Sequence, residues 1–376
     1  MRPLGWLTAS SVVLAMALLS RTAAADSMDP ALARFVADGA CRAAGPSGSG
    51  AYYNPSGGFT GCTTKDALFA KLVAQYGFAI APTAMHSART TGYGGFELAL
   101  EASYTKIDSD ATYWKLGTEG PQDPTTKNFS VVNNSPDSLL QLYSLKIRKG
   151  FPLGIELAGI VGFLPNTNIV TGGADVRWSL LEGFRTEIPA IFPELAVGGG
   201  VRTITGTEEM QLTVAAVDAQ ISKPLPIGGA VVLTPYVGYQ WLRIFGDSGL
   251  IDMTPNTDAL NYCGFAGANT PASPDPTKTY ADGQPVCNAG SSADFNNTAV
   301  LDAVRLSRHR LNAGLQVRYQ VVKVGMHFIT DLVAPEDANK GSDYESPDPS
   351  DPTTDVNDFE GVTKQWTLAF DIGAVF

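Results

Sequence analysis

The C-terminal stretch, residues 364–376, alternates between two kinds of side chain. The apolar positions are Trp366, Leu368, Phe370, Ile372, Ala374 and Phe376. Successive side chains of a strand point to opposite faces, so this spacing predicts a strand with one apolar face and one face of small or polar residues. The predicted strand ends on an aromatic residue.

The same alternation recurs from Tyr93 onward and predicts ten strands. Their approximate ranges are 96–104, 139–147, 155–163, 174–180, 195–201, 212–222, 231–241, 311–319, 324–328 and 364–376. Connections after every second strand are short, and the others are mostly long and rich in Pro, Asp, Asn and Gly. Alternating short and long connections place all long loops at one end of an antiparallel sheet. Residues 76–81 could add a strand, and a second extra strand would then give twelve.

A strand pattern of this kind, closed by a terminal Phe376, resembles that of bacterial outer-membrane β-barrels. The resemblance covers residues 93–376 as a pattern and matches no single characterised family. It implies an all-β, transmembrane antiparallel barrel in the cell outer membrane, with short periplasmic turns and long external loops. It also implies contact with outer-membrane lipid and lipopolysaccharide, and reading of Phe376 by the barrel assembly machinery. A secreted β-sandwich binding protein is the alternative fold.

The first residues predict export. Arg2, an apolar run over residues 4–19 and the small residues Ala23–Ala25 fit a signal peptide spanning residues 1–25. Residues 26–92 lack clean alternation, and residues 66–75 carry apolar side chains at helical spacing. This region is expected to form an N-terminal periplasmic segment or a plug that enters the barrel.

Net charge and cysteine content limit the kinds of partner and cofactor that this chain is expected to bind. The formal net charge of −11 does not suggest nucleic acid. Four cysteines form two local pairs, Cys41 with Cys62 and Cys263 with Cys287, and in an exported chain they predict two disulfides. Neither pair has close spacing or a neighbouring His, so no metal or other cofactor is expected.

Strand parity directs a balanced set of charges into the lumen. The candidates are Glu97, Glu101, Lys146, Arg148, Glu156, Asp175, Arg177, Arg202, Arg318 and Asp371. Ten strands enclose little more than their own side chains. Two functions stay open: a narrow porin-like channel for small solutes, or a structural or surface barrel with a filled lumen.

A basic cluster lies where the strand at 311–319 leaves a long loop. Arg305, Arg308 and Arg310 are candidates for binding lipopolysaccharide phosphates at the outer rim, because guanidinium pairs bidentately with phosphate. Ser307 and His309 share a face, which leaves an outer-membrane lipid hydrolase as an alternative function. Residue types without geometry are weak evidence for catalysis, so no enzyme activity is expected.

Overall fold

The computed structural model describes residues 27–36, 65–121, 132–181, 192–252, 263–265, 285–287, 298–340, 345–347 and 355–376. The expected signal peptide and the Cys41–Cys62 pair lie outside these ranges.

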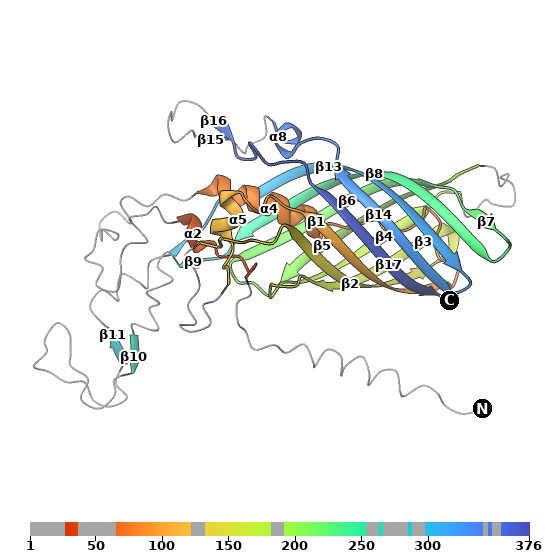
Figure 1. The fold of residues 1–376 in the computed structure, drawn as a ribbon, viewed down its shortest axis with the longest axis horizontal. Coiled ribbons are helices and arrows are strands. Elements are labelled where there is room, and N and C mark those ends of the chain that lie inside the picture. The colour runs from red at the N-terminus through yellow and green to blue at the C-terminus, as the bar shows by residue number, and fades with distance from the viewer. Residues whose placement is uncertain are drawn as a thin grey trace, which may run out of the picture.

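Ten antiparallel strands close into a barrel, as the alternation predicts (Figure 1). The strands are β1 (Phe96–Lys106), β2 (Leu139–Gly150), β3 (Ile155–Phe163), β4 (Val170–Ser179), β5 (Glu194–Thr205), β6 (Met210–Ser222), β8 (Val231–Ser248), β13 (Val304–Tyr319), β14 (Val322–Asp331) and β17 (Trp366–Val375). Pairing of β8 with β13 and of β17 with β1 completes the ring. A short strand, β7 (Leu225–Ile227), pairs with the start of β8 outside the ring.

The two ends of the barrel differ in their connections. At one end, Phe96 and Phe376 exchange backbone hydrogen bonds of 3.0 and 2.7 Å, and a two-residue turn joins β13 to β14. The long connections after β1, β8 and β14 lie at the other end. By the usual topology of bacterial barrels, the end with the C-terminus is the inner, periplasmic end and the end with the long connections is the outer one.

Three small strand pairs lie within the long connections. They are β9 (Ile251–Asp252) with β12 (Thr298–Ala299), β10 (Cys263–Phe265) with β11 (Pro285–Cys287), and β15 (Glu345–Pro347) with β16 (Asp355–Asn357). Cys263 stands directly opposite Cys287 in the backbone register. This register is compatible with the predicted local disulfide, and the bond itself stays a prediction.

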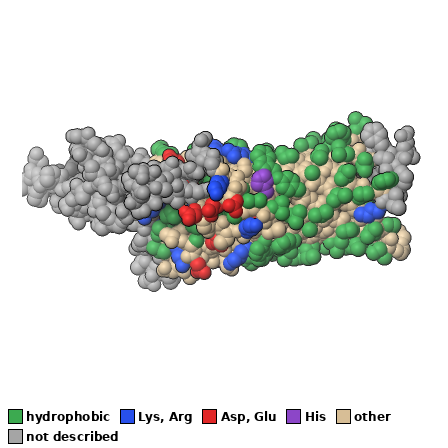
Figure 2. All heavy atoms as spheres, turned by 90° about the horizontal axis from the view of Figure 1, so that it is seen from above, with side chains coloured by type: hydrophobic (Ala, Val, Ile, Leu, Met, Phe, Trp, Pro, Cys, Tyr) green, Lys and Arg blue, Asp and Glu red, His purple; other side chains and the backbone are tan. Residues whose placement is uncertain are grey.

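An apolar belt surrounds the barrel. Outward positions such as Leu100, Val161 and Phe370 are exposed, and the space-filling view shows hydrophobic side chains covering most of the strand region (Figure 2). Lipid covers such a face in a membrane barrel, and polar residues alternate with it on the inside. None of the described helices is both long and apolar enough to cross a bilayer.

The pattern inverts toward the outer end. There the inward positions are apolar, as at Leu142, Leu212 and Ile244, whereas outward positions such as Gln141 and Arg243 are polar. A sheet that faces water instead of lipid must bury its apolar side chains inward. The strands therefore continue beyond the belt: β13 begins at Val304, before the predicted 311, and β8 runs to Ser248, beyond the predicted 241.

Short helices and one long helix complete the fold. They are α2 (Ala33–Val36), α4 (Asp66–Ile80), α5 (Thr112–Gly117), the 3-10 turn η1 (Pro152–Gly154) and α8 (Pro335–Ala338). α4 confirms the predicted helix and extends it through residues 76–80. These residues are therefore not the extra strand that a twelve-stranded barrel would need.

Candidate functional site

A helix occupies the outer mouth of the barrel. α4 is buried over most of its length and packs on inward-facing residues of β2, β6, β8 and β13. Gly77 of α4 lies against Ile244, and Val73 lies against Gly246. A Cβ added at Gly77 would lie 2.6 Å from Ile244 Cγ2, so a glycine at this position permits the close approach of helix and wall.

A buried glutamine ties α4 to the connection after β1. Gln75 Nε2 donates to Asp108 Oδ2 at 2.7 Å and to the Tyr113 hydroxyl at 2.9 Å. Gln75 Oε1 accepts from Trp114 Nε1 at 2.6 Å. Both ends of the amide are therefore bonded, which offsets the cost of burying it among apolar side chains.

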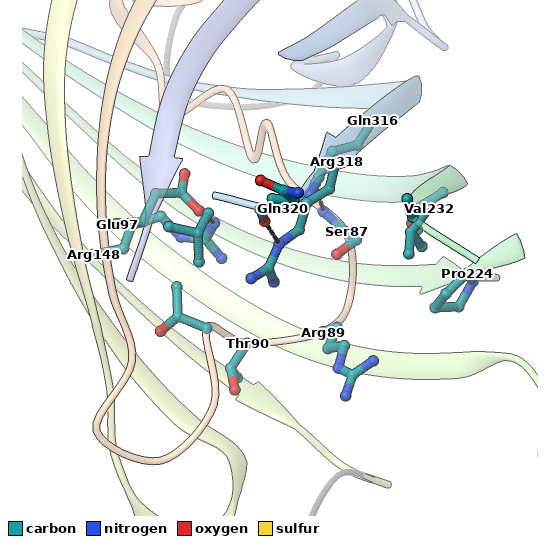
Figure 3. A pocket seen from close by; sticks show the side chains of 14 residues that line it. Ser87, Arg89, Thr90, Glu97, Arg148, Pro224, Val232, Gln316, Arg318 and Gln320 are labelled. Carbon is teal, nitrogen blue, oxygen red and sulfur yellow. Dashed lines mark hydrogen bonds and ion pairs between the residues drawn. The ribbon is translucent and has the colours of Figure 1, made fainter. Parts of the chain in front are cut away.

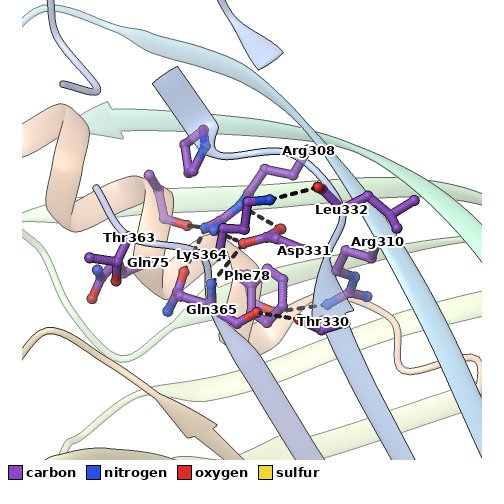
Figure 4. A network of polar contacts seen from close by, with 12 residues as sticks. Gln75, Phe78, Arg308, Arg310, Thr330, Asp331, Leu332, Thr363, Lys364 and Gln365 are labelled. Atoms are coloured by element: carbon purple, nitrogen blue, oxygen red, sulfur yellow. Dashed lines mark hydrogen bonds and ion pairs between the residues drawn. The ribbon is translucent and has the colours of Figure 1, made fainter. Parts of the chain in front are cut away.

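Two buried arginines of β13 form hydrogen bonds to the C-terminal half of α4 from inside the barrel (Figure 4). Arg308 donates to the Ala74 carbonyl at 2.7 Å and forms an ion pair with Asp331. Arg310 donates to the carbonyls of Phe78 and Pro82 at 3.1 and 2.6 Å. Both guanidinium groups also lie over the Phe78 ring, at 4.6 and 4.9 Å from its centroid.

The expectation that Arg308 and Arg310 bind lipopolysaccharide at the rim is therefore wrong. Inward and outward side chains alternate along β13, so consecutive even positions face the lumen. Arg305 does face outward, and it pairs with Asp247 at 2.6 Å. Sequence reasoning also missed Asp331 and Gln365, the luminal partners of Arg308.

After α4 the chain descends through the lumen as an extended segment, residues 81–91, here called the luminal thread. Its backbone bonds to wall side chains at successive depths. Gln220 Nε2 donates to the Ala84 carbonyl at 3.3 Å, and the Ala88 amide donates to Ser222 Oγ at 3.0 Å. The Thr91 amide donates to Glu156 Oε2 at 2.8 Å. From Ala74 to Thr91 the backbone is thus bonded to inward-facing side chains of the barrel wall.

The wall around the luminal thread is lined by ion pairs near the inner end. Arg148 bonds Glu97 and Glu156, each at 2.7 Å. Lys323 bridges Glu97 and Asp371, the latter at 2.7 Å. Three further pairs line the wall: Lys146 pairs with Glu101, Arg177 with Asp218 and Arg202 with Asp175. Buried charges must be paired, and these are.

The structure places most luminal candidates from the sequence in these pairs. Arg318 differs, because it stands exposed at the inner mouth. Lys323 and Asp218 were not among the candidates, although their parity on β14 and β6 is the signal that would have found them. His327 is fully buried beside the Tyr236 ring, and neither of its ring nitrogens has a hydrogen-bond partner among the described residues.

Ser307 and His309 lie on the outer surface of β13, and each is bonded to a residue of β8. Ser307 Oγ accepts a hydrogen bond from Arg243 at 3.0 Å. His309 Nδ1 lies 2.5 Å from the Tyr239 hydroxyl, and the two rings stack. The described residues show no bond between Ser307 and His309, which a base-activated nucleophile requires.

The N-terminal residues cap the outer mouth. The Leu32 amide donates to Glu209 Oε2 at 2.5 Å, and Glu209 lies in the turn between β5 and β6. Burial raises the pKa of Glu209 to about 7, and the nearby carboxylates of Glu119 and Asp29 add to this effect, against the lowering effects of that amide and of Arg34. Burial likewise raises the pKa of Glu119.

We expect docking of residues 27–36 to weaken as pH rises. The docked state favours protonated Glu209, so the stabilisation is complete below the ordinary carboxyl pKa and is lost as pH passes about 7. The hydrogen-exchange protection factor of the Leu32 amide should fall roughly tenfold or more between pH 5 and 8. In Glu209→Gln the fall should be smaller, because of the two carboxyl groups with a raised pKa only Glu119 remains, and protection that rises with pH in the parent would contradict the expectation.

Comparisons with known proteins return the barrel architecture alone. No protein-family model and no curated sequence matches the chain. Among solved structures, the attachment invasion locus protein Ail of Yersinia pestis matches at 9% identity and a TM-score of 0.24, covering 76% of this chain and 100% of its own. Omp33 of Acinetobacter baumannii matches at 9% identity and a TM-score of 0.24, covering 75% of this chain and 98% of its own. The β domain of the Bordetella autotransporter BrkA matches at 8% identity and a TM-score of 0.33, covering 76% of this chain and 100% of its own.

Proposed function

We propose that this outer-membrane β-barrel is a sealed surface barrel and not an open channel. The observation that carries the proposal is the burial of α4 in the outer mouth, where it shares one apolar core with the barrel wall. Displacing it would expose that core to water, at about 25 cal/mol for each Å² of apolar surface. The helix therefore closes the barrel as part of its folded core.

The inner half supports the same proposal in a different way. The luminal thread and the paired charges around it occupy the interior there, and both are held by hydrogen bonds. A passing ion would have to compete with internal partners that already neutralise each charge. Among the described residues, those left at the outer end belong to the N-terminal cap and to the ends of the long connections, and these are available for contact.

Three further assignments belong to this proposal. Ser307 and His309 are not assigned a catalytic role, because among the described residues Ser307 is bonded to Arg243 and not to His309. Lipopolysaccharide phosphates meet the outward-facing Arg305 just above the apolar belt, in place of the buried Arg308 and Arg310. The assembly machinery reads the strand that ends at Phe376.

Planar-bilayer recording of the refolded full-length mature protein tests the seal. We expect no stepwise conductance, whereas a sixteen-stranded porin in the same bilayer provides the positive control. A variant with Met85, His86, Ser87 and Arg89 all changed to Gly thins the luminal thread but leaves α4 intact. It should also be silent if α4 is the seal.

Either recording can overturn the proposal. Steps in the parent protein would show an open channel. Conductance steps in the thinned variant, with none in the parent protein, would show that the luminal thread and not α4 closes the barrel.

A further inference from the structure

The inner end of the lumen contains a pocket that the seal does not require. Its volume is about 240 Å³, and its lining includes Arg89 and Thr90 from the luminal thread and Gln316 and Arg318 from β13 (Figure 3). The rest of the wall comes from the β7–β8 hairpin and from the ends of β1, β2 and β17, including Glu97 and Arg148. Arg89 and Arg318 are exposed, so the pocket opens toward the periplasmic side.

Arg89 and Arg318 lack acidic partners among the described residues. Arg318 Nε donates to the Gln320 carbonyl at 2.9 Å, which positions the guanidinium and leaves its two terminal nitrogens to donate. The deeper luminal arginines behave differently, because Arg148 and Arg177 are each bonded to carboxylates. The pocket is therefore a place where positive charge is left uncompensated.

The acidic residue in the lining does not cancel this charge. Glu97 is buried and already bonded by Arg148, at 2.7 Å, and by Lys323. Gln316 contributes a further donor: its Oε1 accepts from the Ser87 amide at 3.2 Å, and this orients the side-chain amide within the lining. The lining thus offers two guanidinium groups and an amide nitrogen to a ligand.

We propose that this pocket binds a small oxyanion of the phosphate class between Arg89 and Arg318. Guanidinium groups pair bidentately with such oxygens, and the volume admits a phosphate with part of its hydration shell. The two arginines come from the luminal thread and from the wall. A bound anion therefore links them and holds the inner end of the thread in place.

Isothermal titration calorimetry with inorganic phosphate tests the site on the full-length mature protein in detergent at low ionic strength. We expect one anion per chain, with affinity that falls as chloride is added. Arg89→Gln and Arg318→Gln should each weaken binding about tenfold or more, since each removes a charge-assisted contact. Arg243→Gln removes the same charge at the outer end of β8 and should leave binding unchanged.

Two results would overturn the site. One is the absence of phosphate binding at tens of millimolar, and the other is equal weakening by Arg243→Gln, which would indicate a general charge effect. The site does not depend on the seal, because phosphate binding and conductance are measured separately and either can fail alone.

The source of the anion is distinguished by the membrane used. If a phospholipid headgroup of the inner leaflet fills the pocket, phosphate affinity will be lower in phosphatidylglycerol nanodiscs than in a maltoside detergent, whose headgroup carries no phosphate, when both are measured at an ionic strength that screens the membrane charge. If the ligand is a free periplasmic anion, the two affinities will agree. Both results support an oxyanion site and assign its occupant.

Discussion

Asp331→Asn should lower the free energy of unfolding by about 3–5 kcal/mol, the largest single effect expected in this protein. Asp331 and Arg308 form an ion pair in which both side chains are buried. The substitution keeps the shape of the side chain but leaves the guanidinium without a counter-charge beside α4. Equilibrium unfolding by guanidinium chloride in detergent, followed by tryptophan fluorescence, measures the loss.

Asp247→Asn is the matched control. Asp247 also pairs with an arginine at the outer end of the barrel, Arg305, but both side chains are about a third exposed or more. Exposed pairs contribute about 1 kcal/mol or less, so little change is expected. The double variant Arg308→Met with Asp331→Leu should recover most of the loss, because it removes both buried charges. Equal effects of Asp331→Asn and Asp247→Asn would refute the role given to burial.

Gly77→Leu should force α4 away from the barrel wall. A Cβ alone at this position would lie 2.6 Å from Ile244 Cγ2 and 2.7 Å from its Cδ1, closer than carbon atoms approach. We expect a loss of about 1–3 kcal/mol in the free energy of unfolding. If α4 is the seal, the same variant should also show conductance in planar bilayers that the parent lacks.

Gly159→Leu separates this packing effect from the general effect of replacing a glycine. Gly159 lies on the outer face of β3, and a Cβ there meets nothing within 4 Å. This variant should unfold like the parent and stay silent. Adding Ile244→Ala to Gly77→Leu should restore part of the stability by making room. Full stability of Gly77→Leu on its own would show that α4 does not pack as closely as the structure has it.

Most of the barrel could be predicted from the alternation of apolar and polar side chains along the sequence. Lipid and lumen lie on opposite sides of each strand, so apolar and polar side chains alternate every two residues. This alternation indicates a lipid-facing surface at positions such as Leu98, Leu100 and Phe370. The same parity places Arg308 and Arg310 inside and Arg305 outside. Grouping the three arginines by sequence proximity overlooked that alternation, which is why their rim assignment failed.

The candidate pocket was only partly visible in the sequence. Arg318 was a luminal candidate by parity, but nothing local to Arg89 showed that it would stand in the same pocket. The two are far apart in the chain, and the path of the luminal thread brings them together. The unpaired state of both arginines also depends on which carboxylates the wall has already engaged.

By itself, the sequence determined a ten-stranded barrel, its apolar belt and the end that carries long connections, because these follow from period-two patterning and connection length within short stretches. Only the tertiary structure decided what fills the lumen. The contact of Gly77 with Ile244 and the grip of Arg308 on the Ala74 carbonyl join residues that are remote in sequence. Such contacts are set by the closed wall and by the volume it leaves, and no local pattern records that volume.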